Sequence, residues 1–160
     1  ISGDGDLSSI GGNHLIHAAR RDMDLKVICA NNMIYGMTGG QVASTTPKGA
    51  KTSTTGRGNP YRPFDLSRLV AAAGASYVAR YSVTQPLALI RSIKKALSHV
   101  GFSFIEVLSP CPTQYGRRNQ PEKPEEMIQD LIRRCILEEE AKGLSEEELA
   151  EKIITGEFLT

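Results

Sequence analysis

The sequence has few cysteines and almost no net charge. Its three cysteines, Cys29, Cys111 and Cys135, lie far apart, which excludes a disulfide framework and a C-x-x-C metal site. Its 19 basic and 18 acidic residues give a net charge of +1, so electrostatics provides no argument for a nucleic-acid partner. No run of 18 apolar residues and no signal peptide is present, and we therefore expect a soluble, cytoplasmic protein without a membrane partner.

The usual motifs for nucleotide and calcium binding are also absent, although the tetrad Gly3-Asp4-Gly5-Asp6 opens the chain. A dinucleotide fingerprint needs a third glycine where Ser8 stands. No G-x-x-x-x-G-K-[ST] sequence occurs, which excludes a P-loop. An EF-hand is excluded because the further alternating oxygen ligands and the final glutamate are missing. A lone Gly-Asp-Gly-Asp is a common turn former, so its role depends on the residues that follow.

A second oxygen-rich segment follows the tetrad. A helix-like stretch over residues 8–21 and an apolar run over residues 25–30 lead to the pair Asn31-Asn32. If the strands before the tetrad and the pair are adjacent and parallel, Asp4 and Asn32 meet at the carboxyl edge of the sheet. Carboxylate and amide oxygens suit Mg²⁺ or Ca²⁺, and Mg²⁺ commonly keeps waters and substrate phosphates as further ligands. Because glycines allow a phosphate to approach the backbone, the pattern predicts a site for a metal-bound diphosphate.

Helix-like and strand-like segments alternate through the middle of the chain. Residues 64–73 have the apolar spacing of a helix that ends at Gly74, a favourable C-cap, and residues 86–100 repeat this pattern. Residues 76–81 and 102–108 are typical of short strands. The alternation predicts an α/β fold with a doubly wound, mostly parallel sheet that is covered by helices on both faces.

The two ends of the chain differ from this pattern. Almost no residues precede Gly3 to form its strand, so we expect the fold to be N-terminally incomplete in this chain. After residue 121 we expect a helix over residues 127–137 and a second helix after a capping box at residues 145–148. Joined at Gly143, the two helices would form a C-terminal helical extension.

Residues 38–63 form a long polar segment. They are rich in Thr, Gly, Ser and Pro, contain almost no large apolar side chain, and carry four basic residues, Lys48, Lys51, Arg57 and Arg62. A segment of this length in a compact domain is usually either a binding segment or a disordered linker. Its position directly after the asparagine pair favours contact with a cofactor, a carboxylate substrate or a partner subunit.

Several segments together resemble one enzyme family. They are GDGD, GGNHLIHAARR, NNMIYGMTGGQ, FDLSRLVAAAGASYVAR and SPCPTQYGRRN. They resemble the beta subunits of 2-oxoacid:ferredoxin oxidoreductases, which bind thiamine diphosphate, and YGMTGGQ and CPTQYGRRN are most similar to the 2-oxoglutarate branch. The resemblance implies a sheet of the thiamine-diphosphate-binding type, with this domain over residues 1–121 and the helical extension over residues 122–160.

The resemblance also implies the cofactor site. Asp4, the side chain of Asn32 and the carbonyl group of Ile34 would bind Mg²⁺, with two diphosphate oxygens and a water as further ligands. Related branches carry lysine where this chain has Gly39, a departure that leaves no residue of this loop assigned to the 2-oxoacid. The residues expected to bind the cofactor are Gly3, Asp4, Gly5, Asp6, Asn32, Ile34, Tyr35, Gly36 and Thr38.

Cys111 stands apart from the other two cysteines. Cys29 and Cys135 fall in apolar segments, where a buried, unreactive thiol is the usual case. Cys111 lies between two prolines after a strand-like segment, a position that suits a metal ligand and a small buried residue equally. The resemblance implies that Cys111 is the fourth ligand of a [4Fe-4S] cluster whose other three cysteines lie outside this chain, since such clusters are held by four thiolates.

The activity implied by the resemblance is the oxidative decarboxylation of a 2-oxoacid, most simply 2-oxoglutarate, to an acyl-CoA. Electrons would pass through the cluster to ferredoxin, and the cofactor would supply the carbanion chemistry. An alpha subunit, the expected partner, would provide the glutamate that activates the cofactor, so no catalytic residue is assigned in this chain. The alternatives are pyruvate or another 2-oxoacid as substrate, a non-oxidative thiamine-diphosphate decarboxylase or synthase, and a non-catalytic binding fragment.

Overall fold

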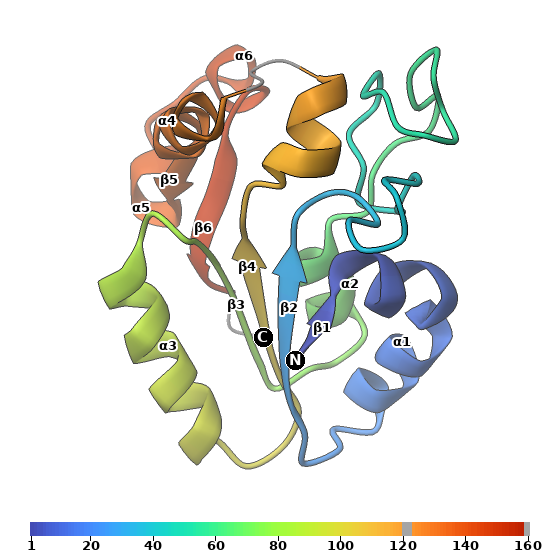
Figure 1. Ribbon diagram of the computed structural model, residues 1–160. Helices are drawn as coiled ribbons and strands as arrows, with labels where there is room; N and C mark the ends of the chain where they lie inside the picture. Colours follow the sequence, from blue (N-terminus) through green and yellow to red (C-terminus); the bar gives the residue numbers. More distant parts are fainter. Residues whose placement is uncertain (120–122, 159–160) are drawn as a thin grey trace.

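A six-stranded sheet forms the centre of the computed structural model, which describes residues 1–119 and 123–158. The strands lie in the order β1-β2-β4-β3-β6-β5 (Figure 1). The first four strands in this order are parallel, which confirms the predicted α/β fold with a doubly wound, mostly parallel sheet. Their bounds are Ser2–Gly3 for β1, Lys26–Asn31 for β2, Ser103–Leu108 for β4 and Tyr77–Ser82 for β3.

Helices cover both faces of the sheet (Figure 1). Helices α1 (Gly12–Arg20) and α2 (Leu66–Ala72) pack on one face, and α3 (Pro86–Ser98) packs on the other. The crossover from β3 to β4 runs across the sheet in the opposite direction to the earlier crossovers, and right-handed connections therefore place α3 on the opposite face. No helix within the two described ranges is long and apolar enough to cross a membrane.

The predicted helix over residues 8–21 is divided into two elements. The π-helical turn η1 (Asp6–Ile10) follows β1, and α1 begins at Gly12. The N–H of Gly11 donates a hydrogen bond of 2.8 Å to the carbonyl oxygen of Asp6. A Cβ atom at position 11 would lie 2.4 Å from that oxygen, so this close approach of two backbone segments requires glycine.

The C-terminal extension contains helices, but also two strands that local periodicity did not predict. The prediction of a helix through residue 137 is wrong for its last three residues, which form β5 beside β6. The capping box at Ser145 is confirmed, although the helix that it begins is a single turn. β6 pairs antiparallel with β3 and extends the main sheet; β-branched residues at 153–155 favour this strand. The elements are α4 (Pro124–Arg134), β5 (Cys135–Leu137), α5 (Glu138–Ala141), α6 (Glu146–Leu149) and β6 (Ile153–Glu157).

The division of the chain at residues 121 and 122 lies outside the described residues, because the structure describes none of residues 120–122. The extension nevertheless packs on the parallel part of the sheet. Leu131 of α4 and Cys135 of β5 share a buried cluster with Leu108 at the end of β4. The two predicted segments thus share a hydrophobic core.

Candidate functional site

The carboxyl ends of β1 and β2 lie side by side and open into one cavity. The two strands pair in parallel, with Gly3 opposite Ala30, so the tetrad and the asparagine pair leave the sheet at the same edge. The cavity next to them has a volume of about 350 Å³. All nine residues predicted to bind the cofactor line it, together with Cys111, Met37 and Thr113. The structure thus brings together the residues that the sequence singled out, while their roles as ligands stay a prediction.

Asp4 is the buried carboxylate of this cavity, with 1% of its surface exposed. Its Oδ1 accepts a hydrogen bond of 3.3 Å from the N–H of Asn32, and its Oδ2 accepts one from the hydroxyl of Thr45. Burial raises the pKa of this carboxyl above its ordinary value, and the two hydrogen bonds partly oppose the shift. Each carboxylate oxygen has two lone-pair sites, so both oxygens keep capacity for a cation.

The turn after β2 presents two further oxygens. Met33 has a left-handed backbone, with φ of 64°, and Asn32 Oδ1 accepts a hydrogen bond of 3.3 Å from the N–H of Ile34. No donor within residues 1–119 and 123–158 reaches the carbonyl oxygen of buried Ile34. A buried carbonyl normally has a partner. Asp4, Asn32 and Ile34 all line one cavity, and the carboxylate, amide and carbonyl oxygens that they carry are hard donors of the kind that fits Mg²⁺.

Glycine at position 5 is required by a tyrosine. The hydroxyl of Tyr35 donates a hydrogen bond of 2.8 Å to the carbonyl oxygen of Gly5. A Cβ atom at position 5 would lie 2.7 Å from the Tyr35 ring. At Gly36 a Cβ atom would reach ordinary contact with Cys111 Sγ and the Asn32 amide, at 3.6 and 3.5 Å. A side chain at position 5 would therefore displace the Tyr35 ring, whereas a Cβ atom at position 36 would lie against Asn32 and Cys111.

Residues 38–63 are an ordered support for this site rather than a disordered linker. The hydroxyl of Thr46 donates a hydrogen bond of 2.7 Å to the carbonyl oxygen of Met33, and Thr45 bonds to Asp4. Asn59 holds the segment together by donating to the carbonyl oxygen of Thr46 at 2.8 Å. The sequence predicted a binding segment but not the contacts of Thr45 and Thr46, because nothing in a threonine-rich stretch indicates which hydroxyl is buried.

Cys111 is the only cysteine that lines the cavity, within the part of the chain that the structure describes. Cys29 and Cys135 are buried away from it, as predicted, and burial raises the pKa of both thiols. Cys111 is also buried, and its Sγ lies 3.7 Å from the hydroxyl of Thr113. The described residues contain no group of three or more His, Cys, Asp or Glu side chains that could hold a metal ion.

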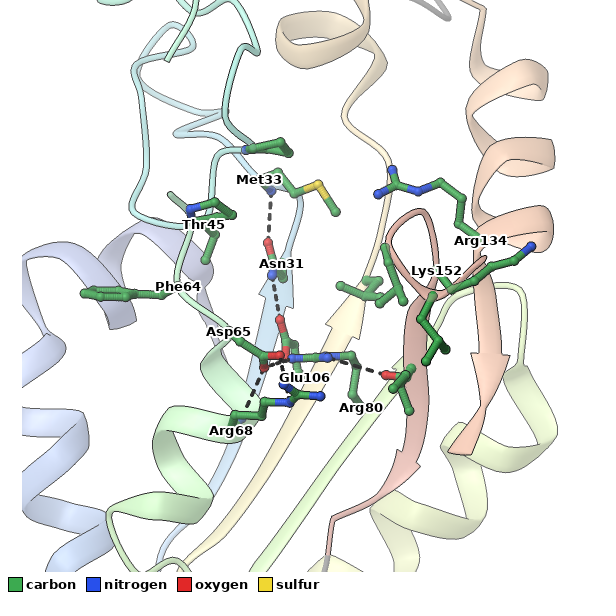
Figure 2. A pocket seen from close by; sticks show the side chains of 16 residues that line it. Asn31, Met33, Thr45, Phe64, Asp65, Arg68, Arg80, Glu106, Arg134 and Lys152 are labelled. Carbon is green, nitrogen blue, oxygen red and sulfur yellow. Dashed lines mark hydrogen bonds and ion pairs between the residues drawn. The ribbon is translucent and has the colours of Figure 1, made fainter. Parts of the chain in front are cut away.

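A second cavity, of about 440 Å³, lies between residues 38–63 and the C-terminal extension (Figure 2). Its floor is a buried polar network on the face of the sheet that α1 and α2 cover. Glu106 of β4 pairs with Arg80 of β3 at 2.8 Å, and Arg80 also contacts Asp65 at the start of α2. This network was not predicted, although a single charged residue inside each of two apolar strands, YVARYS and SFIEVL, is a signal that indicates a buried charge.

Comparison with known families gives one match that covers most of the chain. The model described as "Thiamine pyrophosphate enzyme, C-terminal TPP binding domain" matches residues 1–107. The matched region contains all nine residues predicted to bind the cofactor and both residues that bond to the Asp4 side chain, Asn32 and Thr45, whereas Cys111 and Thr113 lie beyond it.

Curated proteins with similar sequences are named as subunits of 2-oxoacid-metabolising enzymes. The chain is 55% identical over 159 residues to the 2-oxoglutarate synthase subunit KorB of Methanocaldococcus jannaschii, covering 99% of this chain and 59% of that protein. It is 40% identical over 111 residues to the 2-oxoacid:ferredoxin oxidoreductase subunit beta of Saccharolobus solfataricus, covering 69% of this chain and 36% of that protein. The chain thus spans little more than half the length of the first relative, and about a third of the second.

A solved structure has the same fold. It is the 2-oxoglutarate:ferredoxin oxidoreductase from Magnetococcus marinus with 2-oxoglutarate, coenzyme A and succinyl-CoA bound. The TM-score is 0.81 at 28% sequence identity, and the match covers 99% of this chain and 54% of the other. The C-terminal extension is included in the similarity, because the match extends over nearly the whole chain.

Proposed function

Because the chain belongs to the thiamine pyrophosphate enzyme family, through the C-terminal TPP-binding domain, we propose that its β1–β2 cavity binds Mg²⁺ and the diphosphate of thiamine diphosphate. One observation carries the proposal: Asp4, Asn32 and Ile34, which carry a carboxylate, an amide and a backbone carbonyl oxygen, all line one glycine-lined cavity. Mg²⁺ is commonly bound by one or two carboxylates together with substrate phosphates. The single buried carboxylate suits a cation that obtains its remaining charge compensation from a diphosphate.

Each of the nine residues predicted to bind the cofactor has a definite part in this proposal. Asp4 and Asn32 hold the metal through their side chains, and Ile34 holds it through its carbonyl oxygen. Gly3, Gly5 and Gly36 keep side chains out of the space beside the metal, and Asp6, Tyr35 and Thr38 border the diphosphate. The bound cofactor supplies the carbanion and electron-sink chemistry. The chain binds and orients it.

We further propose that the chain belongs to the beta subunit of a 2-oxoacid:ferredoxin oxidoreductase that acts on 2-oxoglutarate. The names of the relatives and the 99% coverage by the Magnetococcus marinus structure support this. An alpha subunit, ferredoxin, coenzyme A and a cytoplasmic location are parts of the same proposal. In this proposal the alpha subunit supplies the activating glutamate, and no side chain of this chain is therefore assigned as a catalytic acid or base.

Cys111 favours this oxidative function over a non-oxidative thiamine enzyme. It lines the same cavity as Asp4 and Asn32, and we propose that it is the fourth thiolate of a [4Fe-4S] cluster. A cluster at this position would lie next to the cofactor, where it could take electrons from it. A decarboxylase or synthase has no need of a thiolate there.

Calorimetry tests the cofactor site. Thiamine diphosphate and Mg²⁺ are titrated into the assembled enzyme, after removal of both, with wild-type chain or with Asp4→Ala. We expect the variant to lose measurable binding, because it lacks the one carboxylate of the donor set. Equal affinity in the two proteins would refute the site.

Spectroscopy and a substrate panel test the reaction. The reduced full-length enzyme should show the electron paramagnetic resonance signal of a [4Fe-4S] cluster, and Cys111→Ala should remove or alter it. With viologen as electron acceptor, 2-oxoglutarate should be oxidised faster than pyruvate or branched 2-oxoacids. Decarboxylation without viologen reduction would indicate a non-oxidative enzyme instead.

A further inference from the structure

The buried carboxylate of Glu106 is bound by three donors. Its Oε1 accepts a hydrogen bond of 2.6 Å from the side-chain amide of Asn31. Its Oε2 accepts one of 2.6 Å from the hydroxyl of Ser67 and one of 2.8 Å from Nε of Arg80. Only 2% of the residue is exposed. Figure 2 shows this carboxylate between Asn31 and Arg80 on the floor of the larger cavity.

This carboxylate fixes the orientation of the Asn31 amide. An ionised carboxylate only accepts hydrogen bonds, so Asn31 must turn its NH₂ group toward Glu106. The Oδ1 atom of Asn31 then faces the other way and accepts a hydrogen bond of 3.0 Å from the N–H of Met33. The dashed lines in Figure 2 follow this path from Glu106 through Asn31 to Met33.

The hydrogen bond to Met33 supports an uncommon backbone. Met33 has φ of 64°, a region that residues other than glycine seldom occupy and that persists only where the surroundings enforce it. Two hydrogen bonds hold this backbone: the N–H of Met33 donates to Asn31, and the hydroxyl of Thr46 donates to the carbonyl oxygen of Met33. Met33 separates Asn32 from Ile34, so its conformation sets the spacing of their two oxygens.

We propose that Glu106 is a positioning residue of the metal site. Acting through Asn31, it holds the turn over residues 31–34 in the conformation that directs the Asn32 and Ile34 oxygens to one cation. This inference rests on the function proposed above. Groups that orient metal ligands without touching the metal typically change its affinity by about 10- to 100-fold when they are removed.

Stability alone gives no reason for a charged pair at this place. Apolar side chains of similar volume usually stabilise a core as well as a buried ion pair does, or better. The Arg80–Glu106 pair nevertheless has further partners. Arg80 donates a hydrogen bond of 3.4 Å to the carbonyl oxygen of Ile154 in β6 and forms an ion pair with Asp65. The network thereby links α2, β3, β4 and β6 to the turn that carries the metal ligands.

The test is a double-mutant cycle on metal affinity. Binding of Mn²⁺, as a paramagnetic substitute for Mg²⁺, is measured by electron paramagnetic resonance in the assembled enzyme with thiamine diphosphate. The variants are Glu106→Gln, Asn31→Leu and their combination. Leucine has nearly the shape of asparagine but no amide, whereas glutamine keeps the shape of glutamate and removes its acceptor-only character.

We expect each single variant to bind Mn²⁺ about 10-fold more weakly, and the double variant to bind no more weakly than Asn31→Leu alone. Wild-type affinity in Glu106→Gln would overturn the proposal. Losses that multiply in the double variant would overturn it too, because Glu106 would then act by a route that bypasses Asn31.

Two controls separate this inference from its alternatives. Tyr77→Phe removes a buried hydroxyl that bonds to Ser92 at 2.9 Å on the opposite face of the sheet, so it destabilises the fold without touching the turn. An equal loss of affinity in Tyr77→Phe would overturn the proposal. If Asp4→Ala retains full Mn²⁺ affinity, the proposed metal site itself is wrong. If Asp4→Ala does not bind Mn²⁺ but Glu106→Gln binds it with wild-type affinity, the metal site stands and only the positioning role of Glu106 is wrong. Should Glu106→Gln not fold, Asn31→Leu decides alone by the same criterion.

Discussion

The hydroxyl of Thr45 donates a hydrogen bond to Oδ2 of Asp4, and the two side chains are almost completely buried. They lie 41 residues apart in the sequence. Asp4 belongs to the smaller cavity, whereas Thr45 lines the larger one, so this contact forms part of the wall between the two. The segment over residues 38–63 thereby holds the carboxylate that we propose as a metal ligand.

Removal of the Thr45 hydroxyl should weaken metal binding. We expect Thr45→Val to reduce the affinity for Mg²⁺ and thiamine diphosphate by about 10-fold or more, because Asp4 loses the donor that orients it. Thr45→Ser, which keeps the hydroxyl, should restore most of the affinity. Thr55→Val is a matched control in the same segment, since the Thr55 hydroxyl bonds to Thr52 and not to the site. Calorimetry on the assembled enzyme measures all three, and unchanged affinity in Thr45→Val would show that Asp4 is oriented by other contacts.

A methyl group at position 5 should disturb both the fold and the site. In Gly5→Ala the new Cβ atom would lie 2.7 Å from the Tyr35 ring, so the ring must move, at a cost of about 1–3 kcal/mol. We expect a lower melting temperature and weaker cofactor binding. Gly12→Ala is the control, because a Cβ atom there meets nothing within 4 Å and should leave stability unchanged or slightly higher. A Gly5→Ala protein as stable as Gly12→Ala would contradict the steric argument.

Replacement of the Arg80–Glu106 pair should affect the stability of the protein and its affinity for the metal differently. Arg80→Met leaves Glu106 buried without its cation and should destabilise the protein by about 3–5 kcal/mol. The double replacement Arg80→Met with Glu106→Leu should recover most of that loss, because it removes both charges. Urea unfolding measures the recovery. Mn²⁺ affinity should nevertheless stay low in the double variant, since Asn31 has lost its acceptor; recovery of both properties would argue against a positioning role.

The metal-free protein should become less stable with rising pH in a defined window. Burial holds the pKa of Asp4 above its ordinary value of 3.8, so between these two pKa values the folded state binds more protons than the unfolded state. Stability then falls as pH rises from 3.8 through the raised pKa. Above this window, metal-free Asp4→Asn should therefore be at least as stable as wild type, while binding Mg²⁺ far more weakly.

Thermal unfolding of both metal-free proteins from about pH 4 to about pH 8 tests this sign. Addition of Mg²⁺ and thiamine diphosphate should raise the melting temperature of wild type but not of Asp4→Asn, because only the carboxylate offers the cation a charge. A metal-free Asp4→Asn protein that melts below wild type above the window would contradict the prediction.

Local patterns in the sequence were sufficient to predict the parallel part of the fold and the residues that meet at the β1–β2 cavity. The alternation of apolar strands with helical periodicity predicted β2, β3 and β4 with their covering helices. The glycine–aspartate tetrad and the asparagine pair predicted the meeting of Asp4 with Asn32, because parallel strands separated by one helix place their carboxyl ends together. The similarity of motifs added Cys111, because a lone cysteine between two prolines does not by itself indicate a metal ligand.

The partners of these residues were decided only by the tertiary structure. Asn31 and Asn32 are neighbours in sequence, yet one bonds to Glu106 in the floor of the larger cavity and the other lines the smaller cavity. Thr45 and Glu106 reach the site across 41 and 75 residues of sequence. The pairing of β6 with β3 likewise depends on a distant edge of the sheet.

Local elements could be predicted and distant partners could not, because the interactions that form them act over different distances along the chain. Helical periodicity, strand alternation and turn formation are set by neighbouring residues, so the sequence by itself determined β2, β3 and β4, their parallel direction and the oxygen-rich ends of β1 and β2. A buried hydroxyl or carboxylate is satisfied by whichever donor or acceptor the packing of distant segments brings near it. Only the folded chain therefore decided that Thr45 bonds to Asp4 and that Glu106 bonds to Asn31, next to the turn that follows β2.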